Sequence, residues 1–298
     1  MEWGLPQKKN PTAGRVDAEW LLAHCLGLRR LDLFLAFDKP LAPPELQQYR
    51  NLLRQRAEGV PVAYLLEEAG FWNLDLHIGP GCLVPRPETE LLVEKVVQAV
   101  EILQQAEPPI LQEQRLQVLE LGVGSGCIPL AVLSETQQVD WVGVDRSWDA
   151  MGYALANRQR HQETCLTQPQ NQLHLVCGNG LAAINPQWQP HFLVSNPPYI
   201  PSDTIPTLQK EVSEVEPRLA LDGGKDGLAF YRALAGYAVR SLAEGGQVLV
   251  EIGFDQGETV PQLFEAQGLH MKEVYKDLAG HPRVVWAEKT ALPPTNGA

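Results

Sequence analysis

The distribution of apolar residues divides the chain into a helical first part and a longer part in which strands and helices alternate. From about Asp17 to Glu58, apolar residues recur at helical spacing, beginning with Ala18, Leu21, Leu22, Cys25 and Leu26. This periodicity predicts amphipathic helices, one of which starts at Pro43. Residues 1–68 are therefore expected to form a small helical domain. Two roles stay open for this domain: it is a packing module, or it docks a protein substrate.

The next segment, residues 69–85, is expected to be a β-hairpin linker. Apolar and polar residues alternate from Phe71 to Pro85, and a Gly-Pro-Gly sequence at 79–81 favours a turn. A helix is then predicted from Glu88 to Leu103, because apolar residues fall on one stripe at Leu92, Val96, Val100 and Leu103.

The remainder, residues 86–298, is expected to be one α/β domain, because short apolar runs alternate with helical patterns. Only Lys276–Arg283 separates the last two runs, which is too short for a helical crossover. We therefore expect a largely parallel, doubly wound sheet with an antiparallel final strand. Its strands are predicted at Gln117–Leu121, Trp141–Asp145, Leu173–Cys177, Phe192–Ser195, Gln247–Ile252, Met271–Tyr275 and Val284–Ala287.

Composition and charge narrow the class of protein. The chain has 298 residues, 44% of them hydrophobic, and a formal net charge of −12, which disfavours a phosphate backbone as the main substrate. Five cysteines without CxxC spacing indicate reduced thiols, and seven histidines without HxxxH spacing predict no metal site. With no signal-peptide pattern and no long apolar run, we expect a cytoplasmic protein without membrane contact.

A glycine-rich loop is the first candidate for chemistry. The sequence Val118-Leu119-Glu120-Leu121-Gly122-Val123-Gly124-Ser125-Gly126 predicts a strand, a tight turn that a ligand can approach closely, and a helix. Asp145 ends the next strand 19 residues after Gly126, a spacing at which an acidic residue bonds ribose hydroxyls. The simpler alternative is a glycine turn that only packs a helix on the sheet.

The spacing GxGxG, in place of GxGxxG, favours S-adenosyl-L-methionine over a dinucleotide. Glu120 at the end of the first strand would repel a pyrophosphate but tolerate a cationic amino-acid group.

The tetrapeptide Asn196-Pro197-Pro198-Tyr199 directly follows another apolar strand. Ligands of open α/β sheets bind outside the carboxyl ends of the strands, so this motif should lie on the same rim as the glycine loop. An Asn amide held at a strand end by two rigid prolines, with a tyrosine ring just beyond, suits a planar group carrying NH2: adenine, cytosine or a glutamine side chain. The alternative is an Asn that only caps a proline turn.

The residue types of the tetrapeptide suit methylation of a planar nitrogen. The Asn196 side-chain oxygen and the Pro197 carbonyl can each accept a hydrogen bond from an NH2 group. Such acceptors stabilise the nitrogen as it gains positive charge, and Tyr199 can hold the flat amide in line with the methyl donor. Asn196, Pro197 and Tyr199 are thus the predicted catalytic residues, and Asn196, Pro197, Pro198 and Tyr199 the predicted substrate-binding residues.

The glycine loop, Asp145 and the tetrapeptide resemble class I methyltransferases that act on exocyclic or amide nitrogen. Together with Phe71-Trp72, Pro85-Arg86-Pro87-Glu88-Thr89-Glu90 and Gly280-His281-Pro282-Arg283-Val284, they resemble the HemK/PrmC family of peptide chain release factor N5-glutamine methyltransferases. The resemblance covers roughly residues 15–290.

This resemblance implies a helical N-terminal domain, a hairpin and a seven-stranded, Rossmann-like methyltransferase domain. It implies that release factors are the protein partners and that the glutamine of their Gly-Gly-Gln motif is methylated. S-adenosyl-L-methionine is the expected cofactor, with binding residues Glu120, Gly122, Val123, Gly124, Ser125, Gly126, Asp145, Asn179 and Asn196.

The chain departs from the family pattern at Asn179 and Gly180, where many relatives carry an acidic and an aromatic residue near the adenine. Arg86 and Glu88 either stabilise the start of a helix or line the rim of the site. Two other functions remain open: a nucleic-acid N6-adenine methyltransferase, which the net charge disfavours, and a cofactor-binding scaffold without activity, which the intact tetrapeptide disfavours.

Overall fold

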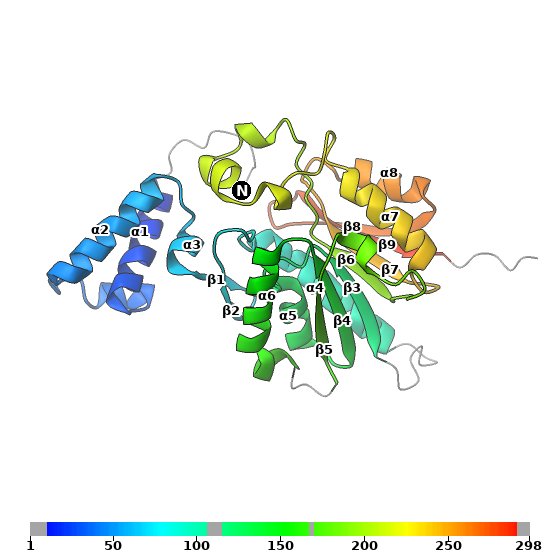
Figure 1. Ribbon diagram of the computed structural model, residues 1–298, viewed down its shortest axis with the longest axis horizontal. Coiled ribbons are helices and arrows are strands. Elements are labelled where there is room, and N and C mark those ends of the chain that lie inside the picture. The colour runs from blue at the N-terminus through cyan, green and yellow to red at the C-terminus, as the bar shows by residue number, and fades with distance from the viewer. Residues whose placement is uncertain (1–10, 106–114, 167–169, 291–298) are drawn as a thin grey trace, which may run out of the picture.

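The computed structural model describes residues 11–105, 115–166 and 170–290, which form a helical unit, a β-hairpin and an α/β unit (Figure 1). The helical unit comprises α1 (Pro11–Leu26), the turn η1 (Arg30–Phe34), α2 (Pro43–Ala57) and α3 (Val62–Leu66). Helix α2 begins at Pro43 as predicted, since proline tolerates the first turn. There Glu45 Oε2 accepts the Ala42 N–H at 2.7 Å, which satisfies one donor that the helix leaves unpaired.

The hairpin consists of β1 (Glu68–Phe71) and β2 (Leu74–His77), and so lies earlier than the predicted Phe71–Pro85. The second strand ends before the Gly-Pro-Gly sequence at 79–81, because these residues do not continue a strand. Phe71 is 2% exposed within the main core. The Trp72 N–H donates to Glu90 Oε1 at 2.8 Å, so both aromatic residues attach the hairpin to the α/β unit.

The α/β unit contains a seven-stranded sheet of order β5-β4-β3-β6-β7-β9-β8. Strand β9 runs antiparallel to both β7 and β8, and the other pairs of neighbouring strands are parallel, which confirms the predicted sheet with its antiparallel final strand. The strands are β3 (Leu116–Leu121), β4 (Val139–Asp145), β5 (Gln172–Cys177), β6 (Phe192–Ser195), β7 (Gln247–Glu251), β8 (Leu269–Lys276) and β9 (Pro282–Lys289).

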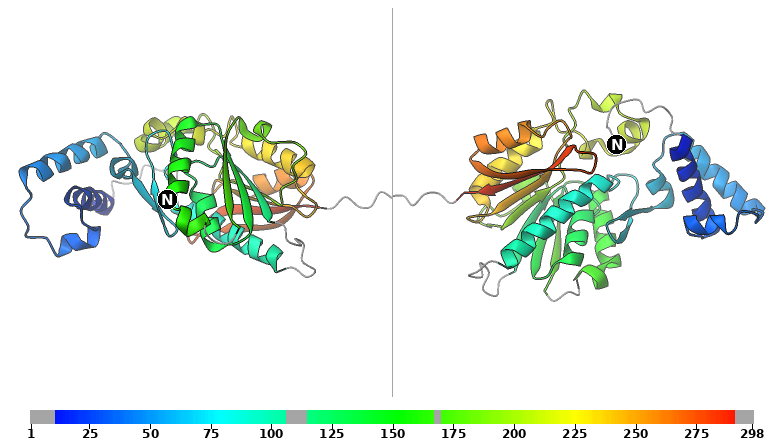
Figure 2. Two further views of the ribbon diagram at one scale, coloured as in Figure 1. Left: turned by 60° about the horizontal axis from the view of Figure 1, so that its bottom comes forward. Right: turned by 180° about the vertical axis from the view of Figure 1, so that it is seen from behind.

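Helices cover both faces of this sheet (Figure 2). Helices α4 (Glu90–Gln104) and α5 (Cys127–Glu135) pack on one face, and α7 (Ala229–Ser241) and α8 (Thr259–Ala266) pack on the other. Helix α6 (Trp148–Arg160) contacts β4 and β5. Short helical turns complete the described chain: η2 (Pro87–Thr89), η3 (Gln162–Leu166), η4 (Gly180–Ala183), η5 (Ile205–Thr207), η6 (Glu211–Val215) and η7 (Arg218–Ala220).

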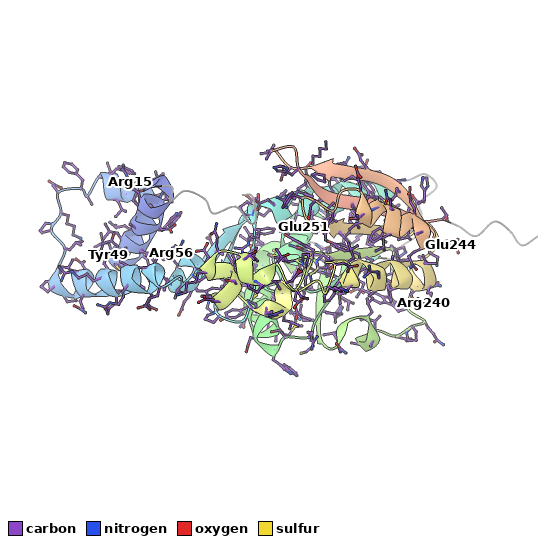
Figure 3. All side chains as sticks on the ribbon, turned by 90° about the horizontal axis from the view of Figure 1, so that it is seen from above. Arg15, Tyr49, Arg56, Arg240, Glu244 and Glu251 are labelled. Carbon is purple, nitrogen blue, oxygen red and sulfur yellow. The ribbon has the colours of Figure 1, made fainter. Side chains whose placement is uncertain are left out.

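The segment between β6 and α7, which carries η5 to η7, lies between the helical unit and the α/β unit (Figure 1). Arg56 of α2, labelled in Figure 3, donates to Asp17 Oδ2 at 2.7 Å and also pairs with Glu211 of this segment. The helical unit is therefore attached to the segment that follows the tetrapeptide. None of the helices in the described part of the chain has the length and apolar character needed to cross a membrane.

Candidate active site

A cavity lies at the carboxyl ends of β3, β4, β5 and β6, where the strand order reverses between β3 and β6. Counted to its open mouth, it encloses about 1110 Å³. A smaller pocket, lined by Asn196, Pro197 and Tyr199, adjoins it. Most of the predicted site residues line the larger cavity: Gly122, Val123, Gly124, Ser125, Asp145, Asn179, Asn196, Pro197 and Pro198.

The glycine loop adopts a conformation that requires glycine. Gly122, Gly124 and Gly126 have φ values of +79°, +57° and +81°, which other residues adopt only with strain. Asp145 holds this loop, because its Oδ2 accepts the Gly124 N–H and its Oδ1 accepts the Ser147 N–H, both at 2.9 Å. Each carboxylate oxygen has a second lone pair, so Asp145 can still accept hydrogen bonds from hydroxyls of a ligand in the cavity.

Two of the predicted cofactor residues are not among those that line the cavity. Gly126 sits behind the loop at the start of α5, where an added Cβ would lie 3.6 Å from Ala154. Glu120 is fully buried, and its Oε2 accepts the Trp141 indole N–H at 2.9 Å.

The direction of the Glu120 side chain follows from the alternation along β3. Leu119 and Leu121 pack towards α7 and α8, so Glu120 points to the opposite face, beside Trp141. Burial raises the pKa of Glu120 well above its usual value, which favours the neutral acid. The carboxyl group is thus not placed as a negative charge facing a cationic ligand.

Asn196 is held by a chain of hydrogen bonds from two distant parts of the sequence. Its Nδ2 donates to Thr89 Oγ1 at 3.1 Å, and Thr89 Oγ1 donates to Glu251 Oε2 at 2.6 Å. Among the residues of 11–105, 115–166 and 170–290, no hydrogen bond reaches Asn196 Oδ1 or the Pro197 carbonyl. Both oxygens are therefore available to accept hydrogen bonds from an NH2 group.

The tetrapeptide rests on a close-packed support. An added Cβ would lie 2.8 Å from Tyr199 Cα at Gly223, and 2.3 Å from the Tyr199 carbonyl oxygen at Gly227. Gln256 Nε2 donates to that same carbonyl at 3.2 Å. At the other end, Ser195 Oγ donates to the Leu121 carbonyl at 2.7 Å, which joins the ends of β6 and β3. The backbone of the tetrapeptide is thus fixed from several elements.

Two buried carboxyl groups lie near the tetrapeptide. Glu251 and Glu216 are 2% and 6% exposed, and burial raises the pKa of each to about 7. The guanidinium of Arg86 pairs with Glu216 of a distant segment, and Arg86 lines both pockets, which agrees with the predicted role at the rim of the site.

Sequence analysis did not identify the residues that support the tetrapeptide, which are Thr89, Gly223, Gly227, Glu251 and Gln256. One signal was available: the buried strand Gln247–Glu251 ends in an acidic residue, and a buried carboxyl needs a partner. Thr89 belongs to the segment 85–90 that carries the family resemblance, but nothing in the sequence indicates its contact with Asn196.

The chemistry of the lining suits a nucleoside. Asp145 offers a carboxylate for a diol, and apolar side chains offer surfaces for a flat ring. Among these apolar residues are Leu121, Val123, Ile128, Val144, Leu219 and Phe230. The residues present therefore fit S-adenosyl-L-methionine.

Known proteins resemble this chain in sequence and in fold. The family model described as the PrmC N-terminal domain matches residues 7–66. A release factor glutamine methyltransferase of Geobacter sulfurreducens is 38% identical over 287 residues, covering 96% of this chain and 94% of the relative. A release factor glutamine methyltransferase of Caulobacter vibrioides is 37% identical over 277 residues, covering 93% of this chain and 90% of the relative.

The fold is also that of a solved methyltransferase. The crystal structure of a Pyrococcus furiosus methyltransferase has a TM-score of 0.51 at 16% identity, and covers 81% of this chain and 99% of that protein. At this identity the likeness concerns the fold alone, and it confirms the predicted class I methyltransferase sheet. The family follows from the near full-length sequence matches: the chain belongs to the release factor glutamine methyltransferase family.

Proposed function

We propose that the protein transfers the methyl group of S-adenosyl-L-methionine to the side-chain amide nitrogen of the glutamine in the Gly-Gly-Gln motif of peptide chain release factors. The names of relatives that match over nearly the whole chain support this activity. The structural observation that carries it is the orientation of Asn196, whose Nδ2 is bound to Thr89 while its Oδ1 has no partner among the described residues.

The larger cavity is the proposed cofactor site. Asp145 is placed to accept hydrogen bonds from ribose hydroxyls, and the loop of Gly122, Val123, Gly124 and Ser125 lets the ligand approach the backbone. Asn179 lines the cavity at the end of β5, beside Gly180, and is the proposed neighbour of the adenine. When bound, the cofactor supplies an activated methyl group.

The tetrapeptide is the proposed glutamine site. Asn196 Oδ1 and the Pro197 carbonyl each accept one N–H of the substrate amide, and Tyr199 packs against the amide plane. An amide nitrogen is a poor nucleophile because its lone pair is delocalised. Two acceptors on its hydrogens favour the positive charge that develops as the nitrogen is methylated, so they stabilise the transition state more than the ground state.

The domain division that we propose follows these roles. Residues 86–298 form the methyltransferase domain, residues 69–85 the hairpin linker and residues 1–68 the helical domain. The release factor approaches the tetrapeptide, and the formal net charge of −12 favours a protein over a nucleic acid at this site.

Transfer of labelled methyl groups tests the proposal. The protein is incubated with labelled S-adenosyl-L-methionine and a release factor, with the same factor lacking its motif glutamine, or with duplex DNA. Label is expected only in the intact release factor. Label that survives replacement of the glutamine would refute the proposed target, and label in DNA alone would favour an adenine methyltransferase.

The variant Asn196→Ala tests the role of the amide. We expect transfer to fall about 100-fold, as when one stabilising group is removed from an active site, while cofactor binding is retained. Asn73→Ala makes the same chemical change at an exposed position in the hairpin turn and should transfer normally. Equal loss of cofactor binding and transfer in Asn196→Ala would contradict the assigned role.

A further inference from the structure

We propose that Thr89 and Glu251 are positioning residues that decide which end of the Asn196 amide faces the substrate. This inference rests on the proposed function and extends it to two residues that act through Asn196; Thr89 borders the larger cavity and Glu251 the smaller pocket. Thr89 ends η2, Glu251 ends β7 and Asn196 follows β6, so the three side chains come from separate elements.

The hydrogen bonds run in one direction through a single hydroxyl. Thr89 Oγ1 has one proton, which it donates to Glu251 Oε2 at 2.6 Å. Its oxygen can then only accept, and it accepts from Asn196 Nδ2 at 3.1 Å. The NH2 end of the Asn196 amide is therefore turned towards the protein, and the oxygen end faces the substrate.

The opposite orientation of Asn196 conflicts with this arrangement. If the amide were flipped, Oδ1 would face the oxygen of a hydroxyl whose proton is already bound to Glu251. Two acceptors would then meet without a proton, and the NH2 of Asn196 would meet the NH2 of the substrate glutamine. A flipped amide thus loses the acceptor that methyl transfer needs.

The side chains of Thr89 and Glu251 are shielded from water, so the donor and acceptor roles in their hydrogen bond are fixed. Thr89 and Glu251 are each 2% exposed, and Glu251 is labelled on the α/β unit in Figure 3. The Tyr231 hydroxyl donates to the Glu251 carbonyl at 2.9 Å, which fixes the end of β7. Burial therefore keeps water from replacing the Thr89 hydroxyl as the partner of Glu251.

The charge of Glu251 controls the arrangement. Burial raises its pKa to about 7, while the Thr89 hydrogen bond, Arg283 and Arg86 oppose that shift and Glu88 adds to it. Above this pH the carboxylate accepts the Thr89 proton. Below it, the carboxyl carries its own proton and donates it to Thr89, whose hydroxyl is then free to donate to Asn196. The flipped amide becomes possible, so transfer should slow as the pH falls through about 7.

A matched pair of variants at position 89 tests the proposal. Thr89→Val keeps the shape but removes the hydroxyl, whereas Thr89→Ser keeps the hydroxyl. Single-turnover transfer to the release factor is expected to fall about 10- to 100-fold in Thr89→Val, the rate equivalent of losing hydrogen bonds to a charged group. Thr89→Ser should stay within about 3-fold of the original protein, because its hydroxyl makes the same bonds. S-adenosyl-L-methionine affinity, measured by calorimetry, should be unchanged in both.

The pH profile of single-turnover transfer separates positioning from a general structural effect. The original protein should lose activity below about pH 7. Both Thr89→Val and Glu251→Gln should lack this acid limb of the profile, because in neither variant does protonation of a carboxyl group at position 251 reach Asn196 through a hydroxyl at position 89. Glu251→Gln keeps the side-chain volume, so it provides the same test if Thr89→Val folds poorly.

Two results would overturn the inference: a Thr89→Val protein as active as Thr89→Ser, or an acid limb that both Thr89→Val and Glu251→Gln retain. Failure of the original protein to methylate the release factor would instead refute the proposed function, and this inference with it.

Discussion

Replacement of Gly227 by alanine should disturb the tetrapeptide without changing any residue that lines the cavity. Gly227 has a φ of +71°, and an added Cβ would lie 2.3 Å from the Tyr199 carbonyl oxygen. That atom belongs to the backbone, so rotation of a side chain cannot relieve the overlap. The Cβ would also lie 3.0 Å from Gln256 Nε2, which donates to the same carbonyl. The tetrapeptide itself must therefore move.

The expected cost follows from two contributions. The left-handed backbone conformation costs a non-glycine residue about 1–2 kcal/mol. Insertion of a methyl group into a packed site adds about 1–3 kcal/mol. Gly227→Ala should thus lower the free energy of unfolding by about 2–5 kcal/mol. Gly245 is a matched control, since its φ is +69° and no heavy atom lies within 4 Å of the added Cβ. Gly245→Ala should lower the free energy of unfolding only by the backbone contribution of about 1–2 kcal/mol.

Urea denaturation and methyl transfer to the release factor measure the two consequences. Gly227→Ala should be less stable than Gly245→Ala by about 1–3 kcal/mol. Its transfer rate should fall about 100-fold, because a displacement near 1 Å at a reacting group has an effect of that size. Gly245→Ala should transfer normally. Equal stability and equal activity of the two variants would show that the tetrapeptide does not depend on close contact with Gly227.

Two further predictions concern Asp145 and Glu251. Asp145→Ala removes the acceptor of the Gly124 N–H and the proposed partner of the ribose, so calorimetry should show cofactor affinity reduced about 10- to 100-fold; an unchanged affinity would contradict the proposed cofactor site. The folded protein raises the pKa of Glu251 from 4.5 to about 7, so this group favours the folded state at low pH and loses that contribution as the pH rises from 4.5 through about 7. Urea denaturation at pH 5 and pH 8 should show a smaller fall in stability for Glu251→Gln than for the original protein, and equal falls would refute the assignment.

The strands of the α/β unit could be predicted from sequence because each is a nearly continuous apolar run. All seven predicted strands are present, and helices alternate with them as expected. The position of β9 between β7 and β8 was not predicted, because pairing between strands is a long-range choice that local pattern does not encode. The hairpin was predicted too late in the chain. The alternation of apolar and polar residues runs on to Pro85, whereas strand pairing ends at His77, before the Gly-Pro-Gly sequence.

The sequence by itself determined the rim on which the site lies. Residues that follow parallel strands meet at the carboxyl edge of the sheet, so the glycine loop, Asp145 and Asn196 were expected together, and they line one cavity.

Only the tertiary structure decided which polar groups touch. Glu120 turns away from the cavity because alternation along β3 points its side chain to the face beside Trp141. The hydrogen bond that Thr89 accepts from Asn196 spans 107 residues of sequence, and the one that it donates to Glu251 spans 162. A hydrogen bond needs atoms about 3 Å apart in a suitable direction, and the packing of separate elements sets that geometry.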